Sequence, residues 1–281
     1  MNKKILITGA NGFVGQQVIK YYSDLDAEIT LILRRQHDNF INNPVIHSII
    51  TTDDMFNEST AWWEDACQNI DIVIHLAWYV EPGKYLESSL NNSCYKGTIS
   101  MMEGAARAGI KRFVGVGTCF EYAFLGLPLD IDSPLDPQTS YAKAKVDTFK
   151  YLTNFCNSHK IEFLWCRLFY LFGEGEHERR LVPVLRKKLL EGKIVELVSG
   201  DKVKDYLDVK DAGRIIGSLA INKHTGPYNV CSGKGVTMRA FTENIADDYN
   251  NGRNLLKFDA IDETNFYDPP FVVGKKTDAN F

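Results

Sequence analysis

The stretch Lys4-Ile-Leu-Ile-Thr8 opens the chain and is followed at once by Gly9-Ala-Asn-Gly12-Phe-Val-Gly15. The first part is an apolar run of the length of a buried parallel strand, and apolar residues continue at helical spacing after it. A strand, a glycine turn and a helix in this order direct free backbone N–H groups and a helix N-terminus toward a pyrophosphate. The stretch therefore predicts a dinucleotide-binding site at the start of the chain.

Apolar runs that predict strands recur as far as about residue 170, and helical stretches separate most of them. The expected strands are Glu28 to Leu33, Val45 to Ile50, Asp71 to Ala77, Phe113 to Gly117 and Phe163 to Phe169. This alternation is typical of an α/β protein with a doubly wound parallel sheet. Ligands of such a sheet bind beyond the carboxyl ends of its strands.

The pattern changes after Gly173. We expect a helix over residues 179–191, a strand over 194–198, a helix over 208–220 and a polar, irregular tail from Asn251. We interpret residues 1–169 as a dinucleotide-binding domain and residues 170–281 mainly as a smaller C-terminal lobe that binds substrate. The segment 205–228 is expected to return to the first domain.

Composition excludes several classes of protein. The net charge of −4 and the pI of about 5.9 provide no basic stripe for nucleic acid. No apolar run approaches the roughly 18 residues that span a membrane, and Met-Asn-Lys-Lys leads straight into the first strand without a signal peptide. We expect a cytoplasmic protein.

The cysteines and histidines show no metal-binding pattern. The six cysteines form no Cys-x-x-Cys pair and no Cys/His spacing, so free thiols and no metal are expected. His75 lies inside the apolar run Asp71-Ile-Val-Ile-His-Leu-Ala77 and is interpreted as a packed strand residue.

A second short pattern lies in Ser140-Tyr-Ala-Lys-Ala-Lys145. Residues four apart share one face of a helix, so the Lys145 ammonium can lie beside the Tyr141 phenol and favour its ionised form. A free tyrosine titrates near ~10 and needs such help at neutral pH. By itself the pattern also fits a solvated helix face.

Further motifs appear in order along nearly the whole chain. They are Thr8-Gly-Ala-Asn-Gly-Phe-Val-Gly15, His75-Leu-Ala77, Lys96-Gly-Thr98, Thr118 with Tyr122, Tyr141 with Lys145, Arg167-Leu-Phe169 with Gly173, Asp205-Tyr-Leu-Asp-Val-Lys-Asp211 and Tyr228-Asn-Val230. In these motifs the chain resembles the extended short-chain dehydrogenase/reductase family, in its nucleotide-sugar epimerase, dehydratase and reductase branch. The resemblance implies a Rossmann-type fold and an NAD(P)-dependent enzyme acting on a nucleotide-diphosphate sugar.

The resemblance also implies roles for three residues. Tyr141 would be the general acid/base at the reacting sugar oxygen, and Thr118 would hydrogen-bond the same oxygen. Lys145 would lower the pKa of Tyr141 and hold the nicotinamide ribose hydroxyls. The cofactor contacts that it implies are Gly9, Asn11, Gly12, Phe13, Val14, Gly15, Leu76 and Ala77, together with Tyr141 and Lys145.

A homodimer is the assembly that the resemblance implies. Its interface would be a four-helix bundle built from a helix over residues 85–108 and one over 141–158. Phe149, Leu152 and Phe155 recur at helical spacing and would supply apolar contacts; an intramolecular core is the alternative for them.

The chain departs from the family after Thr118. The dehydratases of this branch carry Asp-Glu there, whereas this chain has Cys119-Phe120, so a 4,6-dehydratase is not expected. Glu121 is one residue too late, and in an extended segment a shift of one residue turns the side chain to the opposite face.

The combined 3,5-epimerase/4-reductases use a cysteine and a histidine at positions that Phe120 and Arg180 occupy in this chain. Cys119 and His177 are nearby but out of register. We interpret them as a packing residue and a loop residue.

The cofactor type depends on the end of the second strand. An acidic residue there binds the ribose of NAD, while arginine accommodates a 2′-phosphate. Arg34 and Arg35 follow Leu33, which favours NADP(H), with NAD(H) possible and Arg34 as the expected contact. Asp53 or Asp54 would accept a hydrogen bond from adenine, or would cap a loop.

The residues expected on the substrate side are Trp78, Thr118, Tyr170, Arg180 and Lys204. Tyr170 and Lys204 replace an asparagine and an arginine usual in the family. Arg179, Arg180 and Lys204 would form a diphosphate cluster, or else be exposed charges. The aromatic loop Trp78 to Tyr85 would wall the sugar site or cover the cofactor cleft.

Three functions remain open from the sequence. They are an NAD(P)-dependent reductase of an NDP-4-keto-6-deoxyhexose in deoxysugar (surface polysaccharide) biosynthesis, an NDP-sugar 4-epimerase with tightly bound NAD, and a non-catalytic dinucleotide sensor. The presence of Thr118, Tyr141 and Lys145 weighs against the sensor. The reductase is favoured because Arg34 and Arg35 suit NADPH.

Overall fold

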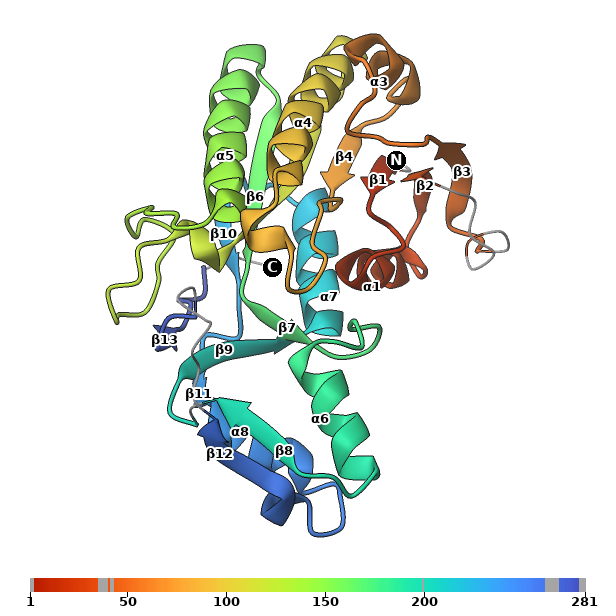
Figure 1. The fold of residues 1–281 in the computed structure, drawn as a ribbon. Coiled ribbons are helices and arrows are strands. Elements are labelled where there is room, and N and C mark those ends of the chain that lie inside the picture. The colour runs from red at the N-terminus through yellow and green to blue at the C-terminus, as the bar shows by residue number, and fades with distance from the viewer. Residues whose placement is uncertain (1–2, 35–39, 41–42, 199, 261–267, 278–281) are drawn as a thin grey trace.

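The computed structural model describes residues 3–34, 40, 43–198, 200–260 and 268–277. Its centre is a seven-stranded parallel sheet in the order β3-β2-β1-β4-β5-β6-β10 (Figure 1). The strands of this sheet are β1 (Lys3–Thr8), β2 (Ala27–Leu33), β3 (Ile46–Thr51), β4 (Ile72–His75), β5 (Arg112–Thr118), β6 (Glu162–Leu168) and β10 (Gly226–Val230). The reversal of strand order beside β1 is that of a doubly wound Rossmann-type sheet, as the sequence predicts.

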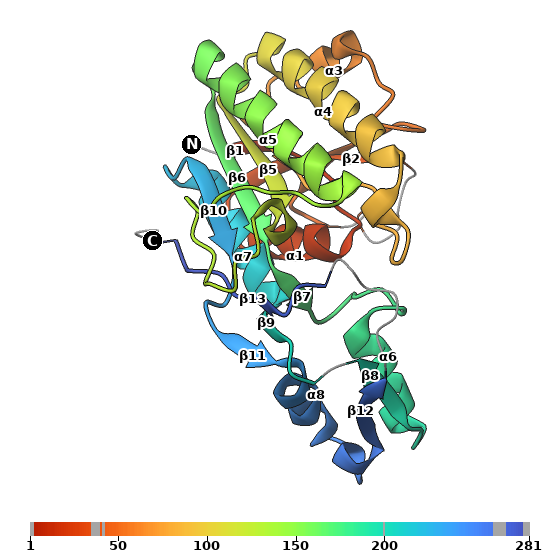
Figure 2. The same ribbon diagram turned by 60° about the vertical axis from the view of Figure 1, so that its left-hand side comes forward.

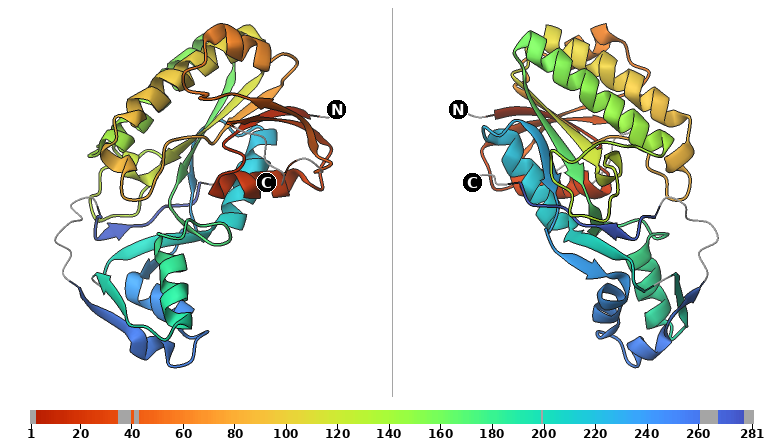
Figure 3. Two further views of the ribbon diagram at one scale, coloured as in Figure 1. Left: turned by 45° about the vertical axis from the view of Figure 1, so that its right-hand side comes forward. Right: turned by 90° about the vertical axis from the view of Figure 1, so that its left-hand side faces the viewer.

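Helices cover both faces of this sheet (Figures 2 and 3). One face carries α1 (Phe13–Tyr22) and α7 (Val209–Ile221), and the other carries α3 (Thr60–Ala66), α4 (Leu90–Arg107) and α5 (Ser140–His159). Successive strand residues point to opposite faces. In β1, accordingly, Ile5 and Ile7 pack in the core under α1 and α7, while Leu6 packs under α4 and α5.

The remaining strands form two smaller sheets below the carboxyl ends of the large one (Figure 1). The four-stranded sheet contains β7 (Tyr170–Phe172), β9 (Val203–Asp208), β11 (Gly235–Thr237) and β13 (Phe271–Val272). The two-stranded sheet pairs β8 (Val195–Val198) with β12 (Leu256–Ala260). The helices of this region are α6 (Leu181–Leu190), α8 (Met238–Ala246) and the short 3₁₀ helix η3 (Gly252–Leu255). Their apolar faces pack on β8 and β12 in a separate core.

Most predicted elements are found, but two predictions are wrong. The tail from Asn251 is not irregular, because β12 pairs with β8 and β13 pairs with β9. The helix expected over residues 85–108 is broken into the 3₁₀ helix η1 (Tyr85–Glu87) and α4. The predicted division into domains at residues 169 and 170 stays a prediction.

Close backbone contact joins α7 to α1, although the two helices lie far apart in the sequence. A Cβ on Gly213 would lie 2.5 Å from the Gln17 Cβ, and one on Gly217 would lie 2.3 Å from the Tyr21 ring. The Tyr22 hydroxyl donates to the Gly217 carbonyl at 2.8 Å. The glycines of α7 therefore set how closely the two helices approach.

Gly213→Ala tests this contact. Alanine normally stabilises a helix by about 0.5–1 kcal/mol relative to glycine. Here the clash with Gln17 should reverse the sign and cost about 1–3 kcal/mol, measured by urea unfolding. Arg214→Ala on the exposed side of the same helix is the matched control and should change stability little. A Gly213→Ala protein at least as stable as the wild type would contradict the tight α1–α7 contact.

Candidate active site

The predicted glycine loop lies at the carboxyl ends of β1 and β4. Gly9 has φ +71°, and a Cβ there would lie 2.7 Å from the backbone nitrogen of Ala77. A Cβ on Gly15 would lie 2.2 Å from the Gly9 carbonyl oxygen. Only glycine fits these two positions, so the loop packs against the end of β4 and against the start of α1.

The start of α1 fits a bound dinucleotide. Gly12 is the N-cap of α1 and supplies no side-chain cap to the helix. The first-turn N–H groups of a helix have no acceptor within the helix and attract phosphate oxygens. The loop residues Gly9 to Gly15 are therefore suited to hold a pyrophosphate at this helix end.

A buried hydrogen-bond chain supports the loop from below. The Thr8 hydroxyl lies 2.8 Å from Nδ1 of His75, and Nε2 of His75 lies 3.0 Å from the Thr98 hydroxyl. The Ala77 N–H donates to the Thr8 hydroxyl at 3.3 Å. Burial, and secondarily the charge of Lys145, lowers the pKa of His75 to about 3. The interpretation of His75 as a packed strand residue is confirmed.

Thr118 and Tyr141 meet at the carboxyl end of β5. Thr118 ends the strand, as predicted, and Tyr141 lies in the first turn of α5. The Thr139 hydroxyl caps α5 by accepting from the Ala142 N–H at 3.1 Å, and this cap fixes the start of the helix beside Thr118. The Thr118 side chain acts on the Tyr141 phenol and lowers its pKa. The predicted pair is therefore assembled.

Lys145 lies one turn further along α5 and is buried. Its ammonium donates to the Val116 carbonyl at 2.6 Å and lies 3.7 Å from the centre of the Trp78 ring. Its distance to the centre of the Tyr141 ring is 6.0 Å. Burial lowers the pKa of Lys145 to about 7, and the negative charge of Glu121 acts in the opposite direction.

The prediction that Lys145 favours the ionised form of Tyr141 is wrong for this arrangement. Burial raises the pKa of Tyr141 well above its usual value, and the neighbouring Tyr85 and Glu121 raise it further. The Thr118 side chain lowers it only in part. The phenol is therefore held in its protonated form, which is the form that can donate a proton.

Trp78 lies over the Tyr141/Lys145 pair. Its indole N–H donates to the Asn91 side chain at 2.9 Å, and its ring meets the Tyr141 ring edge to face at 6.5 Å. Asn91 also binds the Tyr85 carbonyl, and the Tyr85 ring packs on Tyr141 at 4.9 Å. The aromatic loop thus covers the catalytic pair predicted from the sequence. The asparagine that fixes the loop has no motif around it and was missed.

The three cations expected to bind diphosphate have different partners. Arg179 lies 3.3 Å from Glu81, while Arg180 lies 3.7 Å from Glu176. Arg179 therefore connects the segment before α6 to the aromatic loop, and Arg180 pairs with a residue of the turn that precedes α6.

Lys204 is almost fully buried, so the alternative of an exposed charge does not hold for it, and its contact with a diphosphate stays a prediction. It forms an ion pair with Asp268 and donates to the Pro269 carbonyl at 2.5 Å. Tyr170 is half-buried, with its ring centre 5.0 Å from the Lys204 ammonium. Lys204 needs this partner because an unpaired charge would be costly at such depth.

The side chains that were expected to contact adenosine lie at the ends of β2 and β3. Arg34 directly follows β2 and is exposed, and Arg35 lies outside the described residues. Asp54 caps its own loop by accepting from the Phe56 N–H at 3.0 Å and from the Asn57 side chain at 2.8 Å. This is the second of the two roles considered for Asp54, and a contact to adenine stays a prediction.

Cys119 and Leu152 are packing residues. Burial raises the pKa of Cys119 to about 12, and all six cysteines are buried and free. Leu152 is fully buried in the core between α4, α5 and the sheet, so its predicted contact across a dimer is wrong. The dimer itself stays a prediction.

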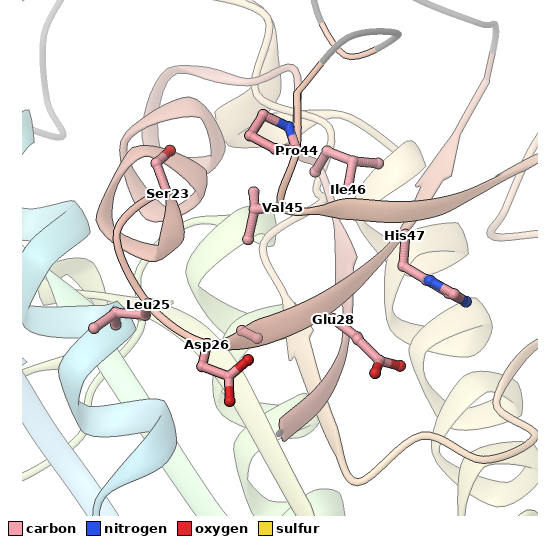
Figure 4. Close-up of a pocket in the computed structure, with 9 residues that line it drawn as sticks. Ser23, Leu25, Asp26, Glu28, Pro44, Val45, Ile46 and His47 are labelled. Atoms are coloured by element: carbon pink, nitrogen blue, oxygen red, sulfur yellow. The ribbon is translucent and has the colours of Figure 1, made fainter. Parts of the chain in front are cut away.

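One hollow of about 450 Å³ lies at the amino ends of the strands, opposite the glycine loop (Figure 4). It is lined by the turn after α1 and by the amino ends of β2 and β3, including Asp26, Glu28 and His47. It is therefore remote from Tyr141. In the described part of the chain no group of three His, Cys, Asp or Glu side chains is placed to hold a metal ion, and no described helix is long and apolar enough for a membrane span.

A parallel doubly wound sheet with a glycine loop and a Thr/Tyr/Lys group at its carboxyl edge defines a dinucleotide-dependent enzyme class of the short-chain dehydrogenase/reductase type. A family model described as the NAD dependent epimerase/dehydratase family matches residues 5–231. The chain belongs to this family, and the predicted resemblance is confirmed.

Two characterised relatives are similar over most of their length. The dTDP-6-deoxy-L-talose 4-dehydrogenase (NAD(+)) of Aggregatibacter actinomycetemcomitans is 28% identical over 88% of this chain and 90% of its own. The dTDP-4-dehydro-6-deoxyglucose reductase of Escherichia coli is 22% identical over 86% of this chain and 80% of its own.

Solved structures share the fold. UDP-glucose 4-epimerase of Thermotoga maritima, solved with UDP-glucose, matches with a TM-score of 0.81 at 18% identity and covers 98% of this chain and 90% of its own. The dTDP-glucose 4,6-dehydratase DesIV of Streptomyces venezuelae, solved with NAD and TYD, matches with a TM-score of 0.79 at 18% identity, over 97% and 88%.

The lowered pKa of Lys145 predicts a pH-dependent stability. Between about pH 7 and the ordinary lysine pKa of 10.5, the unfolded chain binds a proton at Lys145 that the folded chain does not. Stability therefore rises with pH in this window, by up to about 1.4 kcal/mol per pH unit. Lys145→Met has no titrating group at this position and should lack this rise in stability with pH. In urea unfolding at pH 7, 8 and 9, the free energy of unfolding of the wild type should rise relative to that of the variant. If the free energies of both proteins change in parallel with pH, Lys145 is not a buried group that titrates in this range.

Proposed function

We propose that this chain is an NAD(P)-dependent reductase of an NDP-4-keto-6-deoxyhexose in the biosynthesis of a deoxysugar for surface polysaccharide. The observation that carries the proposal is the assembled group of Thr118, Tyr141 and Lys145 at the carboxyl edge of the sheet, beside the glycine loop. In this proposal Gly9, Gly12 and Gly15 hold the cofactor pyrophosphate, and Lys145 binds the nicotinamide ribose. A reduced nicotinamide supplies a hydride.

Tyr141 provides the proton that the reduction requires. Its raised pKa keeps the phenol protonated until the C4 carbonyl oxygen gains negative charge, and the phenolic proton then moves to that oxygen. Thr118 donates a hydrogen bond to the same oxygen and orients it. The tyrosinate left behind regains its proton from solvent.

Two related reactions lack the side chains that they require. Water elimination needs an acid and a base next to Thr118, and Cys119-Phe120 supplies neither, because the pKa of Cys119 is about 12. Epimerisation at C3 and C5 needs a cysteine and a histidine where the chain has Phe120 and Arg180. Simple hydride transfer at C4 needs no further group.

The names of the relatives support a reaction at the same carbon atom, C4. The Aggregatibacter actinomycetemcomitans enzyme is named for 4-dehydrogenation of a dTDP-6-deoxy sugar, and the reverse of that reaction is reduction of a 4-keto-6-deoxy sugar. The Escherichia coli relative is named as a reductase of dTDP-4-dehydro-6-deoxyglucose. Arg34 supports NADPH as the reductant, whereas the first of these names specifies NAD⁺.

An NDP-sugar 4-epimerase is the second candidate. It is supported by the relatives named as UDP-glucose 4-epimerases and by the shared C4 chemistry of Thr118 and Tyr141. An epimerase returns its hydride in each cycle and retains oxidised cofactor. Purified protein that carries NAD⁺ and interconverts two C4 epimers without net redox would replace the reductase by the epimerase.

Tyr141→Phe tests the proton donor. The variant keeps the ring that packs on Tyr85 and Trp78 but removes the proton, so kcat should fall at least ~100-fold while the cofactor still binds. Tyr151→Phe on the same helix is the matched control, because the Tyr151 hydroxyl bonds Glu103 far from the site. Turnover of Tyr141→Phe close to that of the control would remove Tyr141 from the mechanism.

Arg34→Asp tests the cofactor contact and the reaction together. The wild type should oxidise NADPH stoichiometrically on addition of an NDP-4-keto-6-deoxyhexose from a panel of such sugars, with NADH as the poorer donor. The variant should lose at least about tenfold in kcat/KM for NADPH and shift toward NADH, because a 2′-phosphate loses its cation and meets a like charge.

Arg107→Asp is the matched charge change for this test. Arg107 is exposed at the C-terminal end of α4, whose chain continues to the amino end of β5 and so lies away from the cofactor edge. Equal use of NADPH and NADH by wild type and Arg34→Asp would assign no 2′-phosphate contact to Arg34.

A further inference from the structure

The carboxylate of Glu121 lies directly beneath Thr118 and has no exposed surface. Its Oε1 accepts from the Thr118 N–H at 2.8 Å, and its Oε2 accepts from Nε of Arg167 at 2.7 Å. The Trp165 indole N–H lies 3.1 Å from both oxygens. Every interaction of this carboxylate is with a buried donor, so the group is tightly held.

The neighbouring backbone leaves room for this side chain and for nothing more. A Cβ on Gly117 would lie 2.2 Å from Oε1 of Glu121 and 2.3 Å from the Trp165 indole nitrogen. Gly117 is in β5 and directly precedes Thr118. The strand therefore has a glycine, without a Cβ, at the position where the carboxylate approaches the backbone.

Arg167 extends the contact away from the site. Its guanidinium donates to the Tyr122 hydroxyl at 2.9 Å, and the Tyr122 hydroxyl donates to the Asn229 side chain at 2.7 Å. The Asn229 amide donates to the carbonyl of Lys275 at 3.2 Å. A continuous chain of hydrogen bonds, buried as far as Asn229, therefore links Thr118 to β6, to β10 and to the segment after β13.

A buried ion pair is weak evidence for stability, because apolar replacements of similar volume are often no less stable. What an apolar pair cannot reproduce is an acceptor for the Thr118 N–H. Thr118 ends β5, and its hydroxyl accepts from the Phe120 N–H at 3.3 Å, in a capping box whose other half is the bond from the Thr118 N–H to Glu121. The direction of the hydroxyl therefore depends on how the Thr118 backbone is held.

We propose that Glu121 is a positioning residue, which holds the Thr118 backbone so that the Thr118 hydroxyl is aimed at the reacting sugar oxygen beside Tyr141. The inference rests on the proposed function for its kinetic consequence. It assigns to Glu121 no proton transfer and no contact with substrate. Its chemistry differs from that of the dehydratase carboxylate, which directly follows the threonine in sequence.

The charge of Glu121 acts on the same group of side chains. It raises the pKa of Lys145 against the effect of burial, and it raises the pKa of Tyr141. Arg167 balances this charge within the same network. Removal of Glu121 and Arg167 together therefore leaves the net charge of the buried network unchanged.

Two double variants isolate the hydrogen bond to Thr118. Glu121→Gln/Arg167→Met and Glu121→Leu/Arg167→Met both remove the ion pair, but only glutamine keeps an acceptor for the Thr118 N–H. We expect kcat of the leucine variant to be about 10- to 100-fold below that of the glutamine variant, with little change in KM for cofactor. Equal kcat values for the two would overturn the proposal.

Trp165→Phe is the control for general damage to the core. It removes another of the N–H donors to the same carboxylate and leaves the Thr118 hydrogen bond in place. Its kcat should stay close to that of the wild type. A loss as large as that of the leucine variant would overturn positioning in favour of a packing defect.

The same pair of variants in a Thr118→Ala background shows whether Glu121 acts through Thr118. Without the threonine hydroxyl, the leucine and glutamine variants should have nearly the same kcat. Persistence of the full difference in this background would overturn the proposal.

A readout without turnover separates this inference from the proposed function. Amide hydrogen exchange at Thr118, followed by NMR, should be slow in the wild type and in Glu121→Gln/Arg167→Met and fast in the leucine variant. Unchanged exchange in the leucine variant would overturn the contact itself. A wild type that turns over no sugar of the panel would refute the proposed function and leave this measurement valid.

Glu121→Asp provides the test if the leucine variant does not fold. Aspartate keeps the charge for Arg167 but is one methylene shorter, so it cannot reach both Arg167 and the Thr118 N–H. We expect fast exchange at Thr118 and a lower kcat. Slow exchange with undiminished kcat would overturn the proposal.

Discussion

Removal of ionisable side chains from water at the carboxyl ends of β5 and β6 determines the chemistry of this protein. Tyr141, Lys145 and Glu121 are all buried there. Burial penalises every charged form, so the phenol stays protonated and the pKa of the ammonium falls to about 7. The site keeps one compensated ion pair, between Glu121 and Arg167, and uses hydrogen bonds elsewhere. A proton donor and a readily neutralised cation therefore lie side by side.

The local patterns of the sequence were sufficient for the strands β1 to β6 of the large sheet and for the placement of Thr118, Tyr141 and Lys145. Lys4 to Gly15 fixed the first strand, the loop and the helix, and the spacing of Tyr141 and Lys145 placed both on one buried face of α5. These features depend on neighbours within one or two turns of chain. The same is true of Thr118, whose place at the end of β5 followed from the apolar run before it.

Features that depend on distant residues could not be predicted. The ion pair of Lys204 forms with Asp268, which is distant in the sequence, and the polar segment of β12 is a strand because it pairs with β8. The pKa of Tyr141 was expected to fall because a lysine is near in sequence, but the depth of burial decides it. Glu121 is out of register with the dehydratase pattern, yet distant residues of the fold make it an acceptor for both the Thr118 N–H and Arg167.

The return of the chain to the large sheet has a consequence for how the protein forms during synthesis. The strands β1 to β6 can pair once residue 168 is made, but α7 and β10 belong to residues 209–230. Until they emerge, α1 has no helix beside it, and the edge of β6 has no partner. Pairing over such sequence separations is slow and leaves apolar surface open in the meantime. The nascent chain thus carries an unfinished Rossmann-type sheet while the smaller sheets are still being translated.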